Sequence, residues 1–233
     1  MRRTAIISSF LLDSCCVCGK PSGGPLCPDC MDRVKGELYD NFFTRCPACG
    51  NPLPWEDFPC RFCGGVGGTR VMVLSPFAGM TRYLIEELKY TGKREIASPL
   101  ATLYTRAVRD LFPLSPPVIV PIPASRQGRR KRGFDQMKLI ASRMPFDTVC
   151  ALKRISGYQQ KRLDRQARLQ VAGKMFSADL SVLPPERPVV VIDDVVTTGA
   201  SVISALDCLK GRQCAAVVLA GFPLKALTDR NHA

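Results

Sequence analysis

The chain has 233 residues, of which 46% are hydrophobic, and this is enough for one ordinary domain with its own core and a small additional module. Its formal net charge of +13 favours anionic ligands. Since no run of about 18 apolar residues occurs, a transmembrane helix is not expected. The composition therefore indicates a globular protein.

Residues 4 to 12 are mostly apolar and follow Arg2 and Arg3. A basic start before a short apolar run is typical of signal peptides, but no A-x-A-like cleavage site follows, and Asp13 stands where a lipoprotein signal has a small or apolar residue. We expect residues 4 to 12 to form a short helix that docks on the protein, with a targeting element as the alternative. The expected location is the cytoplasm.

Cysteines dominate the next segment, where four C-x-x-C pairs precede residue 64. The pairs are Cys15 and Cys18, Cys27 and Cys30, Cys46 and Cys49, and Cys60 and Cys63. Two such pairs supply the four thiolates of a tetrahedral zinc site, and nearby Gly and Pro residues allow the tight turns between them. A disulfide framework is the alternative, but it conflicts with the missing signal peptide. We expect residues 1–66 to form a double zinc ribbon.

The pairing of the cysteines into sites stays open. Sequential ribbons would use residues 15 to 30 and 46 to 63, whereas a cross-braced arrangement would use the same cysteines in another order. Cys16 is a spare thiol that could replace Cys15 only by breaking the spacing. Because the module has little apolar material, metal would supply most of its folding energy. A structural role is favoured over a recognition surface.

A glycine-rich linker at 64–68 leads into a second domain, predicted for 67–233. The pattern predicts a strand at 71–74 and helices near 81–90 and 96–111, and positions 96, 100, 103, 107 and 111 share one apolar face. Continuous apolar runs at 118–122, 189–193 and 215–220 predict strands covered on both faces. The expected fold is α/β, with an open, mostly parallel sheet and helices on both faces.

Most of the net charge lies between Arg126 and Lys174, where fourteen Lys or Arg residues occur with three Asp. We expect these charges in two loops. The first, residues 121–136, follows a strand, and the second, residues 157–168, is a polar segment of the kind that forms lids. Arg165 lies in this second segment. The charge suits an anionic small molecule or the phosphates of a nucleic acid.

The segment Val189–Ser201 carries the strongest functional signal. An apolar strand ends in Asp193 and Asp194, and the turn after it leads into a helix. The first N–H groups of that helix and the hydroxyls of the turn would cradle a phosphate. The acids would accept hydrogen bonds from sugar hydroxyls. A Walker B strand is the alternative, but no G-x-x-x-x-G-K-[ST] motif accompanies it, and a receiver-like domain would not need the hydroxyl-rich turn.

This segment resembles the phosphoribosyl pyrophosphate (PRPP) motif of type I phosphoribosyltransferases. With its cysteine pairs, the whole chain resembles the ComF family, which joins a double zinc ribbon to such a domain. The likeness extends to residues 88–94 (LKYTGKR), 120–123 (VPIP) and 131–136 (KRGFDQ), and to Gln160, Leu163 and Arg165. The chain departs from the family at Asp135, where Asn is usual, and at Asp164 and Val171, which replace Ser and Asn.

The resemblance implies a type I phosphoribosyltransferase fold and assigns roles to individual residues. Ribose contacts fall to Asp193 and Asp194, and Arg126, Arg130, Arg132 and Arg165 would act on the pyrophosphate. The 5′-phosphate would contact Thr197, Thr198, Gly199, Ala200 and Ser201. Mg²⁺ would arrive with PRPP, held by substrate oxygens and water.

An enzyme of this type would displace pyrophosphate at the anomeric carbon of the ribose by positioning and charge stabilisation. Enzymes of this fold that act on 6-oxopurines carry Asp at the position of Thr197, so a hypoxanthine or guanine acceptor is disfavoured. The ComF resemblance also implies DNA uptake in natural competence, with single-stranded DNA and competence or helicase-type proteins as partners. Three functions remain: a transferase with unknown acceptor, a single-stranded nucleic-acid-binding protein, and a PRPP sensor without turnover.

Overall fold

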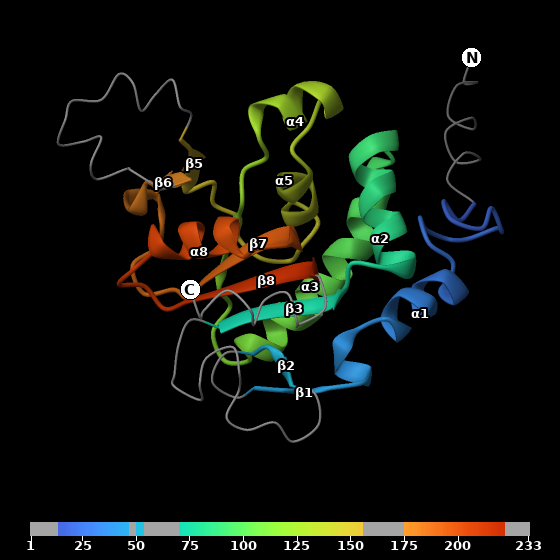
Figure 1. Cartoon of the computed structure of the whole chain (residues 1–233), viewed down its shortest axis with the longest axis horizontal. Helices are drawn as coiled ribbons and strands as arrows, with labels where there is room; N and C mark the ends of the chain where they lie inside the picture. Colours follow the sequence, from blue (N-terminus) through green and yellow to red (C-terminus); the bar gives the residue numbers. More distant parts are fainter. Residues whose placement is uncertain (1–13, 47–49, 54–69, 156–174, 222–233) are drawn as a thin grey trace, which may run out of the picture.

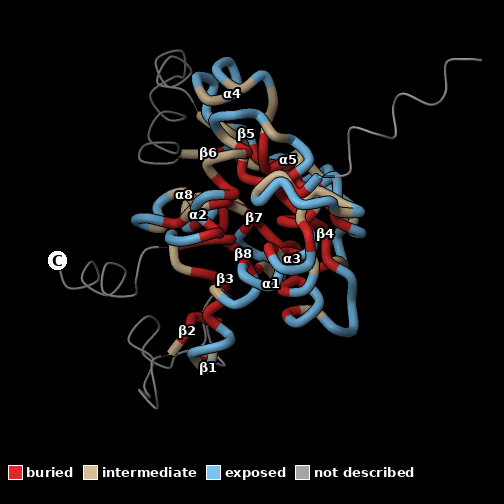
Figure 2. Tube along the Cα trace, turned by 90° about the vertical axis from the view of Figure 1, so that its right-hand side faces the viewer, coloured by how far each residue is buried: buried red, intermediate tan, exposed pale blue. Residues whose placement is uncertain are grey.

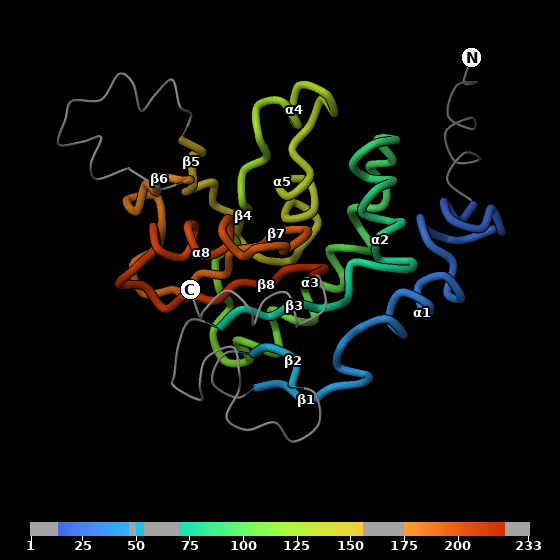
Figure 3. Tube along the Cα trace, viewed as in Figure 1, coloured from blue at the N-terminus to red at the C-terminus, as the bar shows by residue number. Residues whose placement is uncertain are grey.

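A sheet of four parallel strands forms the centre of the computed structural model, which describes residues 14–46, 50–53, 70–155 and 175–221 (Figure 1). The strand order is β3-β8-β7-β4. The bounds are β3 (Arg70–Pro76), β4 (Val118–Pro121), β7 (Val189–Val196) and β8 (Cys214–Gly221). Although β3 and β8 stand far apart in the sequence, they lie side by side along their lengths (Figure 3). The parallel sheet predicted from continuous apolar runs is confirmed.

Both faces of this sheet are covered, so the strands are the most deeply buried part of the trace (Figure 2). Val190 and Ile192 pack with α2 (Gly79–Glu86), α3 (Ala97–Leu111) and α5 (Gln136–Ala141), whereas Val189 and Val191 pack with α8 (Ala200–Asp207). The alternation follows from the two-residue period of a strand. The five positions predicted for the apolar face of the 96–111 helix are all buried. The expected α/β architecture is thus confirmed.

The remaining elements are short. They comprise α1 (Pro28–Gly36), α4 (Arg126–Arg132), the two-stranded sheets of β1 (Thr44–Arg45) with β2 (Pro52–Leu53) and of β5 (Leu152–Arg154) with β6 (Phe176–Ala178), the π-helix η2 (Glu87–Thr91), and the 3₁₀ turns η1 (Tyr39–Asn41), η3 (Arg94–Ile96) and η4 (Leu180–Val182). No helix in the described ranges is long and apolar enough to cross a membrane.

One carboxylate ties the N-terminal segment to the sheet domain. Glu37, which follows α1, accepts hydrogen bonds from the backbone N–H of Met80 at 2.6 Å and from the backbone N–H of Thr81 at 2.8 Å. The Thr81 hydroxyl adds a third bond. These donors belong to the first turn of α2, where a negative charge is favourable. Gly79 permits the approach, because a Cβ there would lie 2.3 Å from Glu37 Oε1.

The expected helix at 4–12, the linker at 64–68 and the basic segment at 157–168 lie outside the described residues. The other basic segment differs from expectation, because its charges do not lie in a loop. Residues 126–132 form α4, whose N-cap Ser125 accepts a hydrogen bond from the backbone N–H of Gly128. Gly133 then ends the helix with a φ of +77°. Arg and Lys are good helix formers, and the cap and the terminating glycine give this short run definite ends.

Candidate functional site

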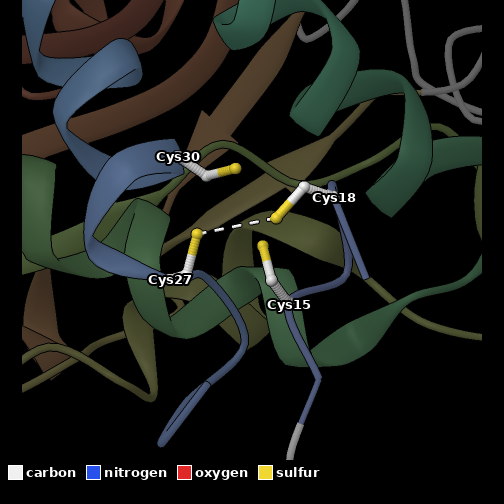
Figure 4. A group of neighbouring side chains, drawn as sticks. All are labelled: Cys15, Cys18, Cys27 and Cys30. Carbon is white, nitrogen blue, oxygen red and sulfur yellow. Dashed lines mark hydrogen bonds between the residues drawn. The ribbon is translucent and has the colours of Figure 1, made fainter. Parts of the chain in front are cut away.

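The first two cysteine pairs come together as one cluster. The sulfur atoms of Cys15, Cys18, Cys27 and Cys30, which we call the four-cysteine cluster, all lie within 4.8 Å of one another and point toward a common centre (Figure 4). Local structure sets their directions. Gly19, at φ +72°, closes the turn after Cys18, while Cys27 and Cys30 flank the first turn of α1, three residues apart.

The geometry of the four-cysteine cluster fits a tetrahedral metal ion. Four sulfurs at about 2.3 Å from zinc stand about 3.8 Å apart, and the Sγ atoms of Cys18 and Cys27 are 3.6 Å apart. Burial and, to a smaller extent, the neighbouring thiols raise the pKa of Cys30 to about 12. A divalent cation reverses this preference, because thiolates bind it after losing their protons. The residues present can therefore hold zinc, in the sequential pairing predicted for 15 to 30.

A second turn repeats the geometry of the first. The N–H of Gly19 donates to the carbonyl of Cys15, and the N–H of Cys15 donates to the carbonyl of Lys20. Around Cys46 the same two bonds recur, from Gly50 to Cys46 and from Cys46 to Asn51, and Gly50 has a φ of +77°. Cys46 is buried. Cys49, Cys60 and Cys63 lie outside the described residues, so the second zinc site stays a prediction.

Asp193 and Asp194, the acidic pair, lie inside β7. The sequence predicts that the strand ends at these residues, but β7 continues to Val196, because Val195 and Val196 extend the pairing with β8. Consecutive strand residues point to opposite faces. Asp194 faces the π-helix η2, where its Oδ1 lies 3.0 Å from Lys89 Nζ. The acidic pair therefore has a cationic partner that the sequence did not predict.

Burial and hydrogen bonds control the charge of the acidic pair. Burial raises the pKa of Asp193 from 3.8 to about 8, and the Asp194 carboxylate raises it as well. The Asp194 N–H, Lys89 and Arg154 act in the opposite direction. The buried Tyr104 hydroxyl donates to the Asp193 carbonyl, and burial holds the pKa of Tyr104 well above its usual value, so it remains a donor. Burial and the neighbouring carboxylate thus favour the protonated form of Asp193.

The turn after β7 has the expected strand, turn and helix order. Gly199 is the N-cap of α8 and has a φ of +77°, which glycine adopts without strain. The Thr198 hydroxyl accepts from the Ala200 N–H at 3.2 Å. Thr197 and Thr198 are exposed. The Ser201 hydroxyl is 4.0 Å from the Met175 sulfur. The turn thus leaves its two threonine hydroxyls on the surface at the start of α8, where the helix dipole favours a negative charge.

The carboxyl end of β4, the strand that pairs with β7, opens into a cavity of about 570 Å³, the cationic cavity. Ile122, just after β4, donates its N–H to the carbonyl of Ile192 in β7, so the two strand ends are neighbours. Five basic residues and no acidic one line the cavity among the described residues. The lining comprises Pro121, Pro123, Ala124, Arg126, Arg129, Lys138, Cys150, Leu152, Lys153, Arg154 and Ile155.

Of the three predicted pyrophosphate residues that the structure describes, one lines this cavity. Arg126 does so, whereas Arg130 is exposed elsewhere on α4 and Arg132 lies back along the helix beside Gly128. Arg165 lies outside the described residues. Arg154, which sequence reasoning missed, both lines the cavity and acts on the charge of Asp193. Its guanidinium stacks 4.7 Å from the centre of the Phe176 ring and is thereby oriented.

Asp135, the departure from the usual Asn, has a structural role. Its Oδ1 accepts from the backbone N–H of Lys138 and caps α5, and its Oδ2 accepts from the backbone N–H of Ala124 at 3.0 Å. The carboxylate therefore fixes the loop that borders the cationic cavity. It is not one of the residues that line the cavity.

Lys89 is the other residue that sequence reasoning missed, although a signal for it was present. In α2 the buried positions are 80, 81, 84 and 85, and the next on this face are 88 and 89. A lysine on an apolar helix face is unusual unless it is paired. That placement indicated a buried anionic partner but could not indicate which one.

No protein-family model matches the chain. DNA utilization protein YhgH from Escherichia coli strain K12 is 28% identical over 186 residues, which cover 75% of this chain and 81% of the relative. Competence protein ComFC from Bacillus subtilis is 26% identical over 83% of this chain and 81% of its own length. The chain is thus similar to a DNA utilization protein and to a competence protein over most of its length.

Competence protein F from Haemophilus influenzae is a further relative, 26% identical over 76% of this chain and 80% of the relative. Among solved structures, adenine phosphoribosyltransferase from Saccharomyces cerevisiae is 15% identical with a TM-score of 0.41, covering 86% of this chain and 94% of that one. Another adenine phosphoribosyltransferase has a TM-score of 0.40 at 15% identity, covering 61% and 78%.

Proposed function

We propose that this ComF-type chain binds PRPP at the carboxyl edge of its parallel sheet. One observation carries the proposal: the acidic pair, the hydroxyl-bearing turn before α8 and the cationic cavity all lie at the neighbouring ends of β7 and β4. Ligands of open parallel sheets bind at this edge. A ribose with a phosphate at one end and a pyrophosphate at the other needs these three kinds of group.

In this proposal the ribose hydroxyls meet Asp193 and Asp194. The 5′-phosphate lies against Thr197, Thr198, Gly199, Ala200 and Ser201, and the pyrophosphate lies in the cationic cavity with Arg126 and Arg154. Arg130, Arg132 and Arg165 are less direct candidates for the pyrophosphate. Mg²⁺ would neutralise part of the phosphate charge and would be held by substrate oxygens and water.

Turnover would consist of displacing pyrophosphate from the anomeric carbon by an acceptor. The cationic cavity would stabilise the negative charge that develops on the departing pyrophosphate. Electrostatic stabilisation of this kind is usually the largest single contribution of an enzyme site to catalysis. Thr197 cannot act as a base at neutral pH, so the acceptor would have to arrive already nucleophilic. The names of the relatives, DNA utilization protein and competence protein, support a place for this activity in DNA uptake.

Calorimetric titration of the protein with PRPP and Mg²⁺ tests the proposal. We expect saturable binding that is lost in Asp193→Asn/Asp194→Asn protein. Asp207→Asn is the matched control, because Asp207 lies on the surface at the far end of α8 and pairs with Lys210. The absence of binding by the unmodified protein would overturn the proposal. Pyrophosphate release over a panel of nucleobases would then separate a transferase from a sensor.

Single-stranded nucleic-acid binding is the second candidate function. The observation that favours it is the exposed basic surface of α4, where Arg126, Arg129, Arg130 and Lys131 continue the charge of the cationic cavity outward. Binding of an oligodeoxynucleotide should weaken steeply as salt rises, since phosphate contacts release counterions. An Arg129→Gln/Arg130→Gln protein should show a smaller salt slope, and an unchanged slope would contradict this role for α4.

A further inference from the structure

The segment that carries Lys89 departs from regular helix geometry. α2 passes at Glu87 into the π-helix η2, which ends before Gly92 at a φ of +75°. A π turn contains one more residue than an α turn, so it changes the direction of the side chains that follow it, and such turns are frequent at functional sites. Here the change accompanies a lysine on the buried side of the helix.

The two oxygens of Asp194 have different surroundings. Oδ1 pairs with Lys89 Nζ at 3.0 Å. Oδ2 is buried and has no hydrogen-bond donor among the described residues. A buried acceptor without a donor is costly. The side chain keeps 12% of its surface exposed, so a hydroxyl that binds at the sheet edge can approach this carboxylate and supply the missing donor.

Three other side chains, Lys89, Arg154 and Tyr104, bear on the acidic pair. Lys89 and Arg154 lower the pKa of Asp193, whereas burial and the Asp194 carboxylate raise it. The neutral Tyr104 hydroxyl donates its hydrogen bond to the backbone carbonyl of Asp193. Lys89 is the cation in direct contact, and its own side chain is only 19% exposed. An ion pair at this depth is held in one geometry, since neither partner gains by turning toward water.

We propose that Lys89 is a positioning residue that holds Oδ1 of Asp194 and so aims Oδ2 at a ribose hydroxyl. This inference rests on the proposed PRPP binding and adds to it a residue from a different part of the fold. Lys89 does not touch the substrate in this role. It acts by fixing the direction of a carboxylate that does.

PRPP affinity, measured with Mg²⁺ by calorimetry, gives the first test. Lys89→Met keeps the unbranched shape and most of the length of the side chain and removes the charge, and we expect it to weaken binding about tenfold or more. Lys89→Arg keeps the charge and should restore most of the affinity. Arg82→Met is the matched control, because Arg82 is a cation on the exposed side of the same helix and pairs with Glu86. It should bind as the unmodified protein does.

The second readout is the titration of Asp193, followed by the carboxyl ¹³C shifts of labelled aspartate in protein without ligand. Loss of the Lys89 charge should move the Asp193 midpoint upward from about 8, while Lys89→Arg should leave it in place. Thermal unfolding of each variant shows whether it is folded. If Lys89→Met does not fold, the comparison of Lys89→Arg with Lys89→Gln provides the same contrast between charge kept and charge removed.

The possible results separate the two proposals. If the unmodified protein does not bind PRPP, the proposed function fails, and the ribose role of Lys89 fails with it. If the unmodified protein binds and a folded Lys89→Met protein binds equally well, only the role of Lys89 is overturned. Weaker binding with an unmoved Asp193 midpoint also contradicts the inference, because Lys89 would then act on affinity without acting on the acidic pair.

Discussion

The four-cysteine cluster and the acidic pair are built in opposite ways. The cysteines come from Cys15 to Cys30, and each is oriented by a turn or helix start within a few residues of it. The acidic pair depends on Lys89, Tyr104 and Arg154, which reach it from three separate elements. The first site is therefore specified by local sequence and completed by metal, whereas the second exists only when the whole sheet domain is assembled.

The two regions are nevertheless connected. Glu37 follows the helix that carries Cys30 and holds the first turn of α2, and α2 leads directly into the π-helix that carries Lys89. At the other end of η2, the Lys93 ammonium donates to the carbonyl of Cys16. The metal-binding segment thus contacts the first turn of α2 and a residue just beyond η2, on either side of the lysine that pairs with Asp194.

Removal of the metal should have the largest effect and should break the local site first. A structural zinc site can supply about 10 kcal/mol or more of folding free energy. We expect Cys27→Ser to remove the metal of the four-cysteine cluster, and chelation to remove all bound metal. Either change should expose residues 14–46 to hydrogen exchange, with smaller changes in β7 and β8. Metal analysis and exchange measured by mass spectrometry check this. Cys16→Ser, outside the four-cysteine cluster, should retain its metal; loss of metal there would contradict the assignment of the ligands.

Breaking the connection should have the next largest effect. Glu37→Gln removes the charge at the start of α2 and turns one acceptor into a donor, which should cost about 2 kcal/mol of unfolding free energy. Urea unfolding measures it. Glu86→Gln is the control, because its exposed pair with Arg82 contributes at most about 1 kcal/mol. Equal losses in the two variants would show that Glu37 does not join the regions as described.

The raised pKa of Asp193 should make the free energy of unfolding depend on pH. The folded pKa of Asp193 is raised from 3.8 to about 8, so between these values the folded state binds more protons than the unfolded state. The free energy of unfolding must therefore fall as pH rises through this window, by about 1.4 kcal/mol or more. Asp193→Asn should flatten this part of the curve. Urea midpoints from pH 5 to 8 test it, and a curve that rises with pH would contradict the raised pKa of Asp193.

The same contrast explains how far the sequence could predict the structure. The C-x-x-C spacing gave the four-cysteine cluster, and the apolar runs gave the parallel strands, because both depend on neighbouring residues. The acidic pair was found as a motif, but its partners were not, since the contacts of Lys89 and Arg154 form across the fold. The predicted end of β7 was wrong, because the pairing of β7 with β8, rather than the position of the two acids, decides where the strand stops.

Asp135 is intermediate between a site built from neighbouring residues and a site built across the whole fold. It joins Ala124, eleven residues earlier, to the start of α5. Both of its oxygens accept a backbone N–H. Asparagine has one acceptor oxygen, so Asp135→Asn must give up one of the two bonds, at a cost of about 1 kcal/mol. Thermal unfolding should show a small decrease in Tm, while PRPP affinity stays near its normal value because Asp135 does not line the cationic cavity. A large loss of affinity with an unchanged Tm would instead place this carboxylate in the binding site.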